Sequence, residues 1–372
     1  MKVLIIGGSG FLSSELLEIL SNSSYDISVV NRGNRKNIYP PGIMHIKADV
    51  KSPSAKELFA NTRYDVIIDF VSYTVADLEQ VLDVFLLKCK QFIFISTACV
   101  YRRAANDGIL KESSPLVNAN WDYSRNKADC ESLLKDKTAN IGTAYTIVRP
   151  YITYGRERLP FGLLPDNGYH WSFIERILKD EPIFVWDNGN AVTTLTHITD
   201  FTQALVGLIG NPKAYNESFH VVSNESYTWE EVILLIGESV GKVPVIRKIA
   251  SIEIIKFFPE YRGILLGDRC LDATFDNSKI RKVLNDFVFS TSLSDGINEV
   301  IHSYKTHNYY QGIDYSWQGR IDRLISNQND IKYNSYRLKT MKFNLRDYIL
   351  YSANRYFPTR LATKITRFLR KI

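Results

Sequence analysis

Tyr123 and Lys127 are four positions apart in the sequence, a spacing that suits general acid/base chemistry if the two residues lie on one helix. The segment from about Trp121 to Leu134 is predicted to be helical, so a spacing of four places both side chains on one face, one turn apart. An ammonium group beside a phenol favours the phenolate and lowers the tyrosine pKa toward the range of a general acid/base. An exposed helical pair without function is the alternative, because this spacing is common by chance.

Two hydroxyl-bearing residues, Ser96 and Thr97, follow a predicted strand that ends at Ile95. Open parallel sheets bind ligands at the carboxyl ends of their strands, so a hydroxyl there can bridge a substrate oxygen and the tyrosine. Thr97, Tyr123 and Lys127, in this order along the chain, therefore form the predicted catalytic trio.

These groups need a frame that binds a cofactor, and the segment from Lys2 to Leu17 predicts one. A short apolar strand leads into a glycine turn, and apolar residues at helical spacing follow. Glycine permits backbone angles that a Cβ forbids and lets the main chain approach a pyrophosphate, whose charge the helix N-terminus binds. The predicted cofactor-binding residues of this turn are Gly7, Gly8, Ser9, Gly10, Phe11 and Leu12. A turn that needs glycine for geometry alone is the alternative.

The second predicted strand, Asp26 to Val30, ends at Asn31, where dinucleotide folds usually carry an acid for the ribose 2′-hydroxyl of NAD. Asn31 does not repel a 2′-phosphate, and Arg32, Arg35 or Lys36 could pair with one. The pattern favours NADP over NAD and leaves both open, with a solvated basic loop as the alternative.

Strands and helices continue to alternate after this point, which is typical of a doubly wound, Rossmann-like parallel sheet of the α/β class. Asp49 follows the third strand, where its side chain could accept a hydrogen bond from an adenine amino group. The other predicted cofactor contacts are Val50, Phe70, Val71, Arg149 and Pro150, together with Tyr123 and Lys127.

The size and composition of the chain fit a globular protein with a large core and one or two closely joined domains. It has 372 residues, of which 45% are hydrophobic and 23% charged. We expect a dinucleotide-binding domain at 1–165, a substrate-binding region at 166–310 with segments returning to the sheet, and a basic extension at 311–372. The four cysteines lack metal-ligand or disulfide spacing, so no metal site is predicted, and with no leader or apolar span evident we expect a cytoplasmic protein.

The C-terminal extension carries a strong positive charge. Residues 332–372 contain eleven Lys or Arg and one acid, Asp347, a net charge of +10 against +6 for the whole chain. Two amphipathic helices are predicted there, at 345–357 and from about residue 361. The second has an apolar stripe of Leu361, Ile365, Phe368, Leu369 and Ile372. We expect this stripe to pack on the catalytic body or on a second subunit of a homodimer, with an anionic membrane surface as the alternative.

The motifs together resemble the extended short-chain dehydrogenases/reductases of the NAD-dependent epimerase/dehydratase family, over about residues 1–305. The matching segments are 7–12, 94–101, 123–127, 148–150 with 154–155, and 196–200. The resemblance implies that Tyr123 is the acid/base, that Lys127 also holds the nicotinamide ribose, and that Thr97 positions the substrate oxygen. It further implies reversible hydride transfer at a sugar carbon, with a nucleotide sugar as the small-molecule substrate.

Some positions depart from this family pattern. Sugar-nucleotide 4,6-dehydratases carry an acid pair after the threonine, where this chain has Ala98-Cys99, so the comparison disfavours water elimination. The Asn31-Arg32-Gly33 strand ending resembles a subgroup related to chloroplast stem-loop RNA-binding proteins. A non-catalytic RNA-binding protein of the same fold is therefore the alternative function, although the tail lacks an RNA-recognition motif and nucleic acid is the less favoured partner.

Overall fold

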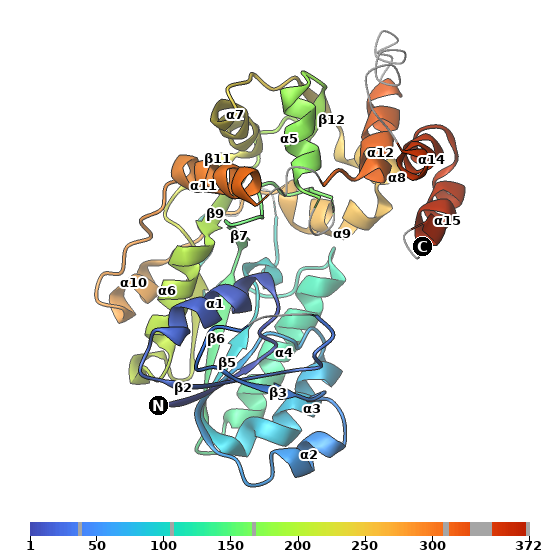
Figure 1. Ribbon diagram of the computed structural model, residues 1–372. Coiled ribbons are helices and arrows are strands. Elements are labelled where there is room, and N and C mark those ends of the chain that lie inside the picture. The colour runs from blue at the N-terminus through green and yellow to red at the C-terminus, as the bar shows by residue number, and fades with distance from the viewer. Residues whose placement is uncertain (36–38, 105–107, 166–168, 308–311, 328–343, 370–372) are drawn as a thin grey trace. The chain divides into compact units, whose positions relative to one another are not determined.

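The computed structural model describes residues 1–372 apart from 36–38, 105–107, 166–168, 308–311, 328–343 and 370–372 (Figure 1). The chain divides into two compact units, each made from separate stretches of sequence. Unit 1 comprises Met1–Thr153, Thr194–Ser226 and Ala273–Thr291, and unit 2 comprises Tyr154–Thr193, Tyr227–Asp272 and Ser292–Ile372.

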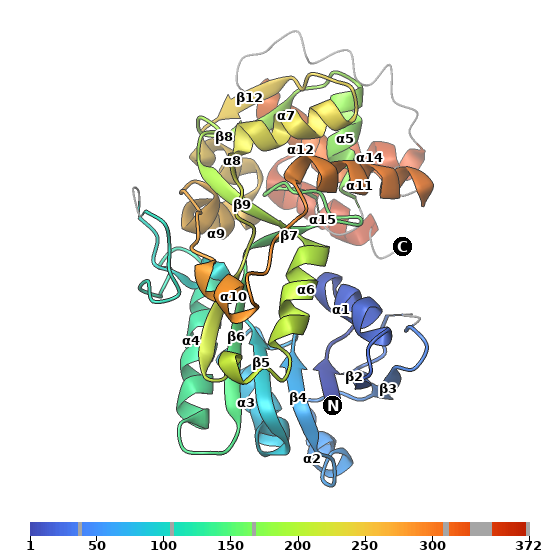
Figure 2. The ribbon, with the colours of Figure 1, turned by 90° about the vertical axis from the view of Figure 1, so that its left-hand side faces the viewer.

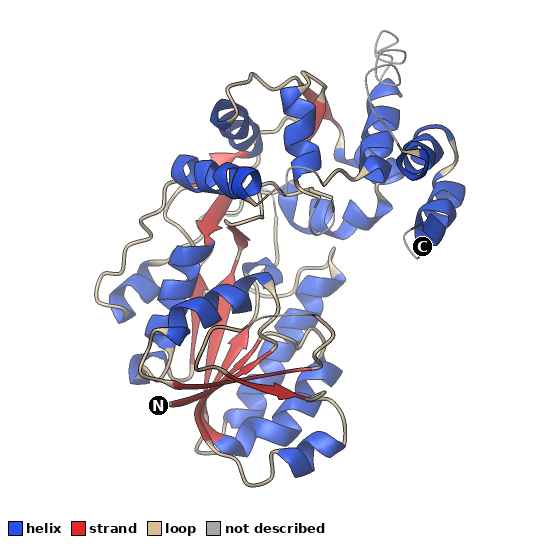
Figure 3. Ribbon diagram, viewed as in Figure 1, coloured by secondary structure: helices blue, strands red, loops and turns tan. Residues whose placement is uncertain are grey.

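Unit 1 is built on a seven-stranded parallel sheet of order β10-β6-β5-β4-β1-β2-β3. Its strands are β1 (Lys2–Ile6), β2 (Asp26–Asn31), β3 (Met44–Lys47), β4 (Tyr64–Asp69), β5 (Cys89–Ile95), β6 (Ala144–Pro150) and β10 (Glu217–Val221). The strand order runs outward from β1 in both directions, to β2 and β3 on one side and to β4, β5, β6 and β10 on the other, and helices lie on both faces of the sheet (Figure 3). The predicted doubly wound parallel sheet is confirmed.

Helices cover both faces of this sheet because its strands are apolar on both sides. The helices of unit 1 are α1 (Phe11–Ser21), α2 (Ser54–Leu58), α3 (Val75–Phe85), α4 (Asp122–Thr138), α6 (Ile198–Leu208) and α10 (Ser278–Val283). In β1, Val3 and Ile5 pack with α1 and α6, whereas Leu4 and Ile6 pack with α3 (Figure 2). The alternation of side chains along a strand thus produces two buried layers, one on each face.

Unit 2 is mainly helical. Its elements are α5 (Trp171–Leu178), β8 (Ile183–Trp186), α7 (Trp229–Ser239), β12 (Ile246–Ile249), α8 (Ser251–Phe257), α9 (Arg262–Ile264), α11 (Leu293–Thr306), α12 (Tyr315–Ser326), α14 (Leu345–Tyr356) and α15 (Thr359–Leu369). Strands β8 and β12 pair in parallel. Three more strands, β7 (Ile152–Tyr154), β9 (Val192–His197) and β11 (Ser226–Thr228), each contain a point at which the chain passes between units, and it passes again after Asp272 and after Thr291.

None of the described helices combines the length and the apolar character that crossing a membrane requires.

Candidate active site

The glycine turn between β1 and α1 is fixed by its backbone and by close packing. Gly7 has φ +120° and Gly8 has φ +76°, a region that side-chain-bearing residues rarely adopt. A Cβ on Gly8 would lie 2.1 Å from Cγ2 of Val29, and one on Gly7 would lie 3.2 Å from Phe70 and from Val71. Four residues that the sequence predicts to contact the cofactor therefore lie close together: Gly7 and Gly8 in the turn, and Phe70 and Val71 just after β4.

Asn31, at the end of β2, braces this turn. Its Nδ2 donates to the carbonyl oxygen of Gly7 at 2.7 Å and to the hydroxyl of Tyr39 at 2.6 Å. Its Oδ1 accepts from the main-chain N–H of Gly33 and lies 3.2 Å from Nε2 of His45. These four contacts use the hydrogen-bonding capacity of an amide side chain, so they favour a bracing role. Direct contact of Asn31 with a cofactor stays a prediction.

The surroundings of the turn fit an anionic ligand such as the pyrophosphate of a dinucleotide. The first turn of α1 contains no acidic residue, so nothing there opposes an anion at the helix N-terminus. Arg35 is exposed, and its Nη1 donates to the carbonyl oxygen of Ser9 at 2.8 Å, which places a guanidinium beside the turn. Arg32 is exposed as well, and Lys36 lies outside the described residues.

Lys127 on α4 is almost completely buried, with 2% of its surface exposed. Its Nζ donates to the carbonyl oxygen of Ile95, the last residue of β5, at 2.8 Å and to that of Ser72, beyond β4, at 2.7 Å. Burial lowers the pKa of Lys127 to about 8, and the charge of Asp69 offsets part of this effect. The ammonium is thus held at the carboxyl ends of two central strands, where a doubly wound sheet binds its ligands.

Tyr73 brings the predicted acid/base and the lysine into one aromatic cluster. The Nζ of Lys127 lies 4.7 Å from the centroid of the Tyr73 ring, and the Tyr73 and Tyr123 rings are 6.4 Å apart. Tyr123 is half-buried and also contacts Trp121, with ring centroids 5.1 Å apart. Burial raises the pKa of Tyr73, so this neighbouring phenol keeps its proton at neutral pH.

Asp69, the last residue of β4, was missed by the sequence reasoning. It is fully buried, and its Oδ1 accepts from the main-chain N–H groups of Val71 and Ser72 at 2.8 and 3.3 Å. Burial raises the pKa of Asp69, while its hydrogen bonds and the charge of Lys127 act in the opposite direction. A carboxyl group at a strand end inside an apolar run was the available signal, because such a group is seldom buried without a task.

Thr97 lies two residues beyond β5, at the start of a short 3₁₀ turn, η2 (Ala98–Val100). Its Oγ1 accepts from the N–H of Cys99 at 3.2 Å, which leaves the hydroxyl proton to donate elsewhere. The neighbouring Ser96 has a different role, because its buried hydroxyl donates to Oε1 of Glu131 at 2.6 Å.

Glu131 and Arg149 form a buried ion pair that the sequence reasoning did not identify. Nε of Arg149 donates to Oε1 of Glu131 at 2.9 Å and Nη2 to Oε2 at 2.5 Å, and both side chains are at most 1% exposed. Nη1 of Arg149 also donates to the hydroxyl of Tyr101, which lies 2.5 Å from Nε2 of His220. The guanidinium is therefore engaged within unit 1, and the predicted contact of Arg149 with a cofactor stays a prediction.

The remaining predicted contacts lie at neighbouring strand ends. Asp49 is exposed beyond β3, and its Oδ1 accepts from the N–H of Lys51 at 3.1 Å. Val50 is buried beside it, and Pro150 is buried at the end of β6. Across the described ranges, no group of three or more His, Cys, Asp or Glu residues could hold a metal ion.

Comparison with known families gives a match over more than half of the chain. The sequence model of the NAD dependent epimerase/dehydratase family matches residues 3–222. These residues include the glycine turn, Thr97, Tyr123 and Lys127.

Individual relatives are distant. The chloroplast stem-loop binding protein of 41 kDa b from Arabidopsis thaliana is 28% identical over 240 residues, and the match covers 61% of this chain and 59% of that protein. A protein named as an uncharacterized UDP-glucose epimerase, YtcB of Bacillus subtilis, is 23% identical over 349 residues, or 84% of this chain and all of that one. Among solved structures, UDP-glucuronic acid 4-epimerase from Bacillus cereus in complex with NAD has a TM-score of 0.65 at 21% identity. That alignment covers 83% of this chain and 98% of the epimerase, a likeness of fold.

Proposed function

Because this chain belongs to the NAD-dependent epimerase/dehydratase family, we propose that it catalyses reversible hydride transfer at a hydroxyl-bearing carbon of a nucleotide-linked sugar. Two reactions share this chemistry, epimerisation and reduction of a keto sugar. The observation that carries the proposal is the position of Lys127, whose buried ammonium is bound at the ends of β4 and β5 and contacts the ring next to Tyr123.

Each member of the trio has a defined task in this proposal. Tyr123 takes the proton from the substrate hydroxyl on oxidation and returns it to the ketone oxygen on reduction. Lys127 favours the phenolate form of Tyr123 and donates to the ribose next to the nicotinamide. Thr97 donates its hydroxyl proton to the same substrate oxygen. When bound, the nicotinamide supplies or accepts the hydride.

NADP is the cofactor that we propose, with NAD as the alternative. The main support is the absence of an acid at the end of β2, where Asn31 stands, together with the guanidinium of Arg35 beside the glycine turn. Arg35 and Arg32 would pair with a 2′-phosphate, and the turn and the first residues of α1 would hold the pyrophosphate.

Water elimination is not part of the proposal. The residues that follow Thr97 are Ala98 and Cys99, both buried in η2, and neither carries an acidic group.

A screen of UDP-, GDP- and dTDP-linked sugars with NAD(H) and NADP(H) tests this function. We expect conversion of at least one sugar, with tighter binding of the NADP(H) pair. An epimerase keeps its cofactor and returns the hydride to the same sugar, whereas a ketoreductase releases oxidised cofactor in step with product. Failure to bind either cofactor would contradict the proposal.

The pH dependence of cofactor affinity reports the charge of Lys127. With a pKa of about 8, the ammonium is present below that pH and is lost as the pH rises through it. Loss of one charged hydrogen bond to the ribose should weaken binding about tenfold on the alkaline side. Calorimetric titration with NADP across this range measures the effect, in Tyr123→Phe protein so that the Tyr123 phenol does not contribute.

Two variants distinguish Lys127 from other titrating groups. Lys127→Met should bind weakly at every pH, with a flat profile. Asp69→Asn should move the midpoint to lower pH, because the Asp69 charge raises the pKa of Lys127. A flat profile in protein that retains Lys127 contradicts the proposed ribose contact.

RNA binding is the second candidate, favoured by the similarity to the Arabidopsis stem-loop binding protein. This role would be favoured over catalysis if the protein converts no sugar and if a stem-loop RNA binds the unchanged chain and the Tyr123→Phe variant equally.

A further inference from the structure

Helix α14 packs closely on α12 within unit 2 (Figure 1). A Cβ on Gly319 of α12 would lie 2.5 Å from the carbonyl oxygen of Tyr351, so glycine permits the near approach of the two helices. The hydroxyl of Tyr351 donates to Oδ2 of Asp322 at 2.6 Å, and Nη2 of Arg355 donates to Oγ of Ser326 at 2.6 Å. These contacts make α14 a firm base for the helix that follows.

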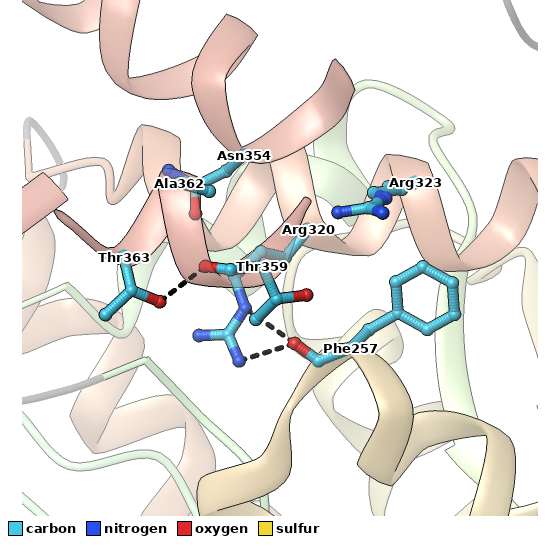
Figure 4. Close-up of a pocket in the computed structure, with 7 residues that line it drawn as sticks. All are labelled: Phe257, Arg320, Arg323, Asn354, Thr359, Ala362 and Thr363. Atoms are coloured by element: carbon cyan, nitrogen blue, oxygen red, sulfur yellow. Dashed lines mark hydrogen bonds between the residues drawn. The ribbon is translucent and has the colours of Figure 1, made fainter. Parts of the chain in front are cut away.

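Helix α15 packs on this base through its alanine and threonine face. Ala362 is 2% exposed, and Oγ1 of Thr366 accepts from Nδ2 of Asn354 on α14 at 2.9 Å. The same face lines a small pocket, which Figure 4 shows with its seven residues: Phe257, Arg320, Arg323, Asn354, Thr359, Ala362 and Thr363. The docked side of α15 is therefore small and polar.

The two arginines of this pocket are already bound within unit 2. Nε and Nη2 of Arg320 donate to the carbonyl oxygen of Phe257 at 3.0 and 2.7 Å, and Nη1 pairs with Glu260. Nη1 of Arg323 donates to the carbonyl oxygen of Phe357, just before α15, at 2.5 Å. We therefore interpret the pocket as part of the support for α15 and not as a ligand site.

The apolar stripe of α15 faces away from this support. Leu361 and Phe368 are 44% and 64% exposed, and Ile365 between them is only partly covered. On α14, Leu345 and Tyr356 are 77% and 57% exposed, whereas Ala353 is 2% exposed and is buried within unit 2. Packing of the stripe on the catalytic body or on a second subunit stays a prediction, and Ile372 lies outside the described residues.

Positive charge follows the exposed stripe. Arg360, Lys364 and Arg367 are all exposed. Each of them comes one position before an apolar residue of the stripe, namely Leu361, Ile365 and Phe368. Within each set the residues are separated by four and then by three positions, so each set forms a row along the helix. The basic row and the apolar row are therefore adjacent. The sequence of α15 contains no acid.

We propose that α15 binds the surface of an anionic lipid bilayer, lying in the plane of the interface. Leu361, Ile365 and Phe368 would enter the headgroup and acyl boundary, while the adjacent cations contact lipid phosphates. The opposite face of the helix is held by α14, so the helix is already folded and oriented, which lowers the entropic cost of binding. This surface lies outside the candidate active site, so the proposal is independent of the reaction.

Charge complementarity favours lipid over a second copy of the chain. The basic row borders the stripe along one side, so two copies of α15 packed antiparallel, stripe against stripe, would place like charges together. Lys and Arg stems can extend along an apolar surface and keep their charged ends at the headgroups.

Sedimentation of the full chain with vesicles tests the proposal. The probes are vesicles of phosphatidylcholine alone and vesicles of phosphatidylcholine and phosphatidylglycerol in equal parts. We expect binding to the anionic vesicles, which added salt weakens, and little binding to the neutral ones. The double variant Leu361→Ser, Phe368→Ser should lose about 10- to 100-fold in partitioning. The triple variant Arg360→Glu, Lys364→Glu, Arg367→Glu should lose the preference for anionic lipid.

A matched control replaces exposed apolar residues elsewhere. Val243 and Leu87 are 83% and 73% exposed, so Val243→Ser with Leu87→Ser removes similar apolar surface and should leave vesicle binding unchanged. Circular dichroism of each variant checks that the fold is retained.

Three outcomes would overturn the proposal. One is absence of the full chain from the anionic vesicle pellet, and a second is equal binding by the α15 double variant and the control. The third is that the full chain does not bind vesicles but self-associates in a concentration-dependent way, and that the double variant abolishes this self-association. That result would assign the stripe to an interface between copies.

Discussion

Replacing Tyr123 with phenylalanine should lower kcat about 10³-fold and leave cofactor affinity nearly unchanged. The change removes only a hydroxyl group, and the ring contacts with Tyr73 and Trp121 can persist. Without the phenol the proposed general acid/base is lost, and the Thr97 hydroxyl can only form a hydrogen bond to the substrate oxygen, whereas the groups proposed to bind the cofactor stay in place. Steady-state rates with the sugar found in the screen, together with calorimetric cofactor titration, measure both quantities.

Tyr73→Phe is the matched control for this prediction. Tyr73 belongs to the same cluster, and its ring lies 4.7 Å from the Lys127 ammonium. Its side chain is half-exposed, and the burial of the other half raises the pKa of its phenol. Its loss should change kcat less than about tenfold. The reverse pattern, a large loss in Tyr73→Phe and a small one in Tyr123→Phe, would transfer the acid/base role to Tyr73.

Local sequence signals were sufficient to predict the fold of unit 1. The unbroken apolar runs of β1, β4 and β5 indicate strands buried on both faces, and the glycine turn between β1 and α1 indicates a strand-to-helix corner. Both features depend on residues close together in the chain, where backbone geometry and side-chain period determine the outcome. The structure confirms the resulting parallel sheet.

Contacts between distant residues could not be predicted in the same way. Asn31 was assigned to the cofactor from its position at the end of β2, but its partner Gly7 lies in the turn after β1 and its partner His45 lies on β3. The burial of Asp69 beside Lys127 likewise depends on β4 and α4 meeting, which no local pattern encodes. In the tail, periodicity identified the apolar stripe of α15, but the face that contacts α14 is made of small threonine and alanine residues, which a hydrophobic pattern does not single out.

The ion pair of Glu131 and Arg149 leads to the second large prediction, which concerns stability. Glu131→Ala should lower the free energy of unfolding of unit 1 by about 3–5 kcal/mol, because it leaves a guanidinium buried without its counter-charge. Hydrogen exchange at the amides of β5 and β6, read by mass spectrometry, reports this free energy for unit 1 without requiring both units to unfold together. Asp129→Ala, at an exposed position on the same helix, is the control and should change it little.

A paired replacement separates the energy of the charge pair from the cost of an unpaired charge. Glu131→Leu combined with Arg149→Met removes both charges and should recover much of the stability that Glu131→Ala loses. The double variant still lacks the acceptor of the Ser96 hydroxyl, and Ser96 precedes Thr97 in the chain. We therefore expect it to be folded but impaired in kcat. Full stability in Glu131→Ala would contradict the burial of a charged Arg149, and full activity in the double variant would show that Thr97 is positioned without this network.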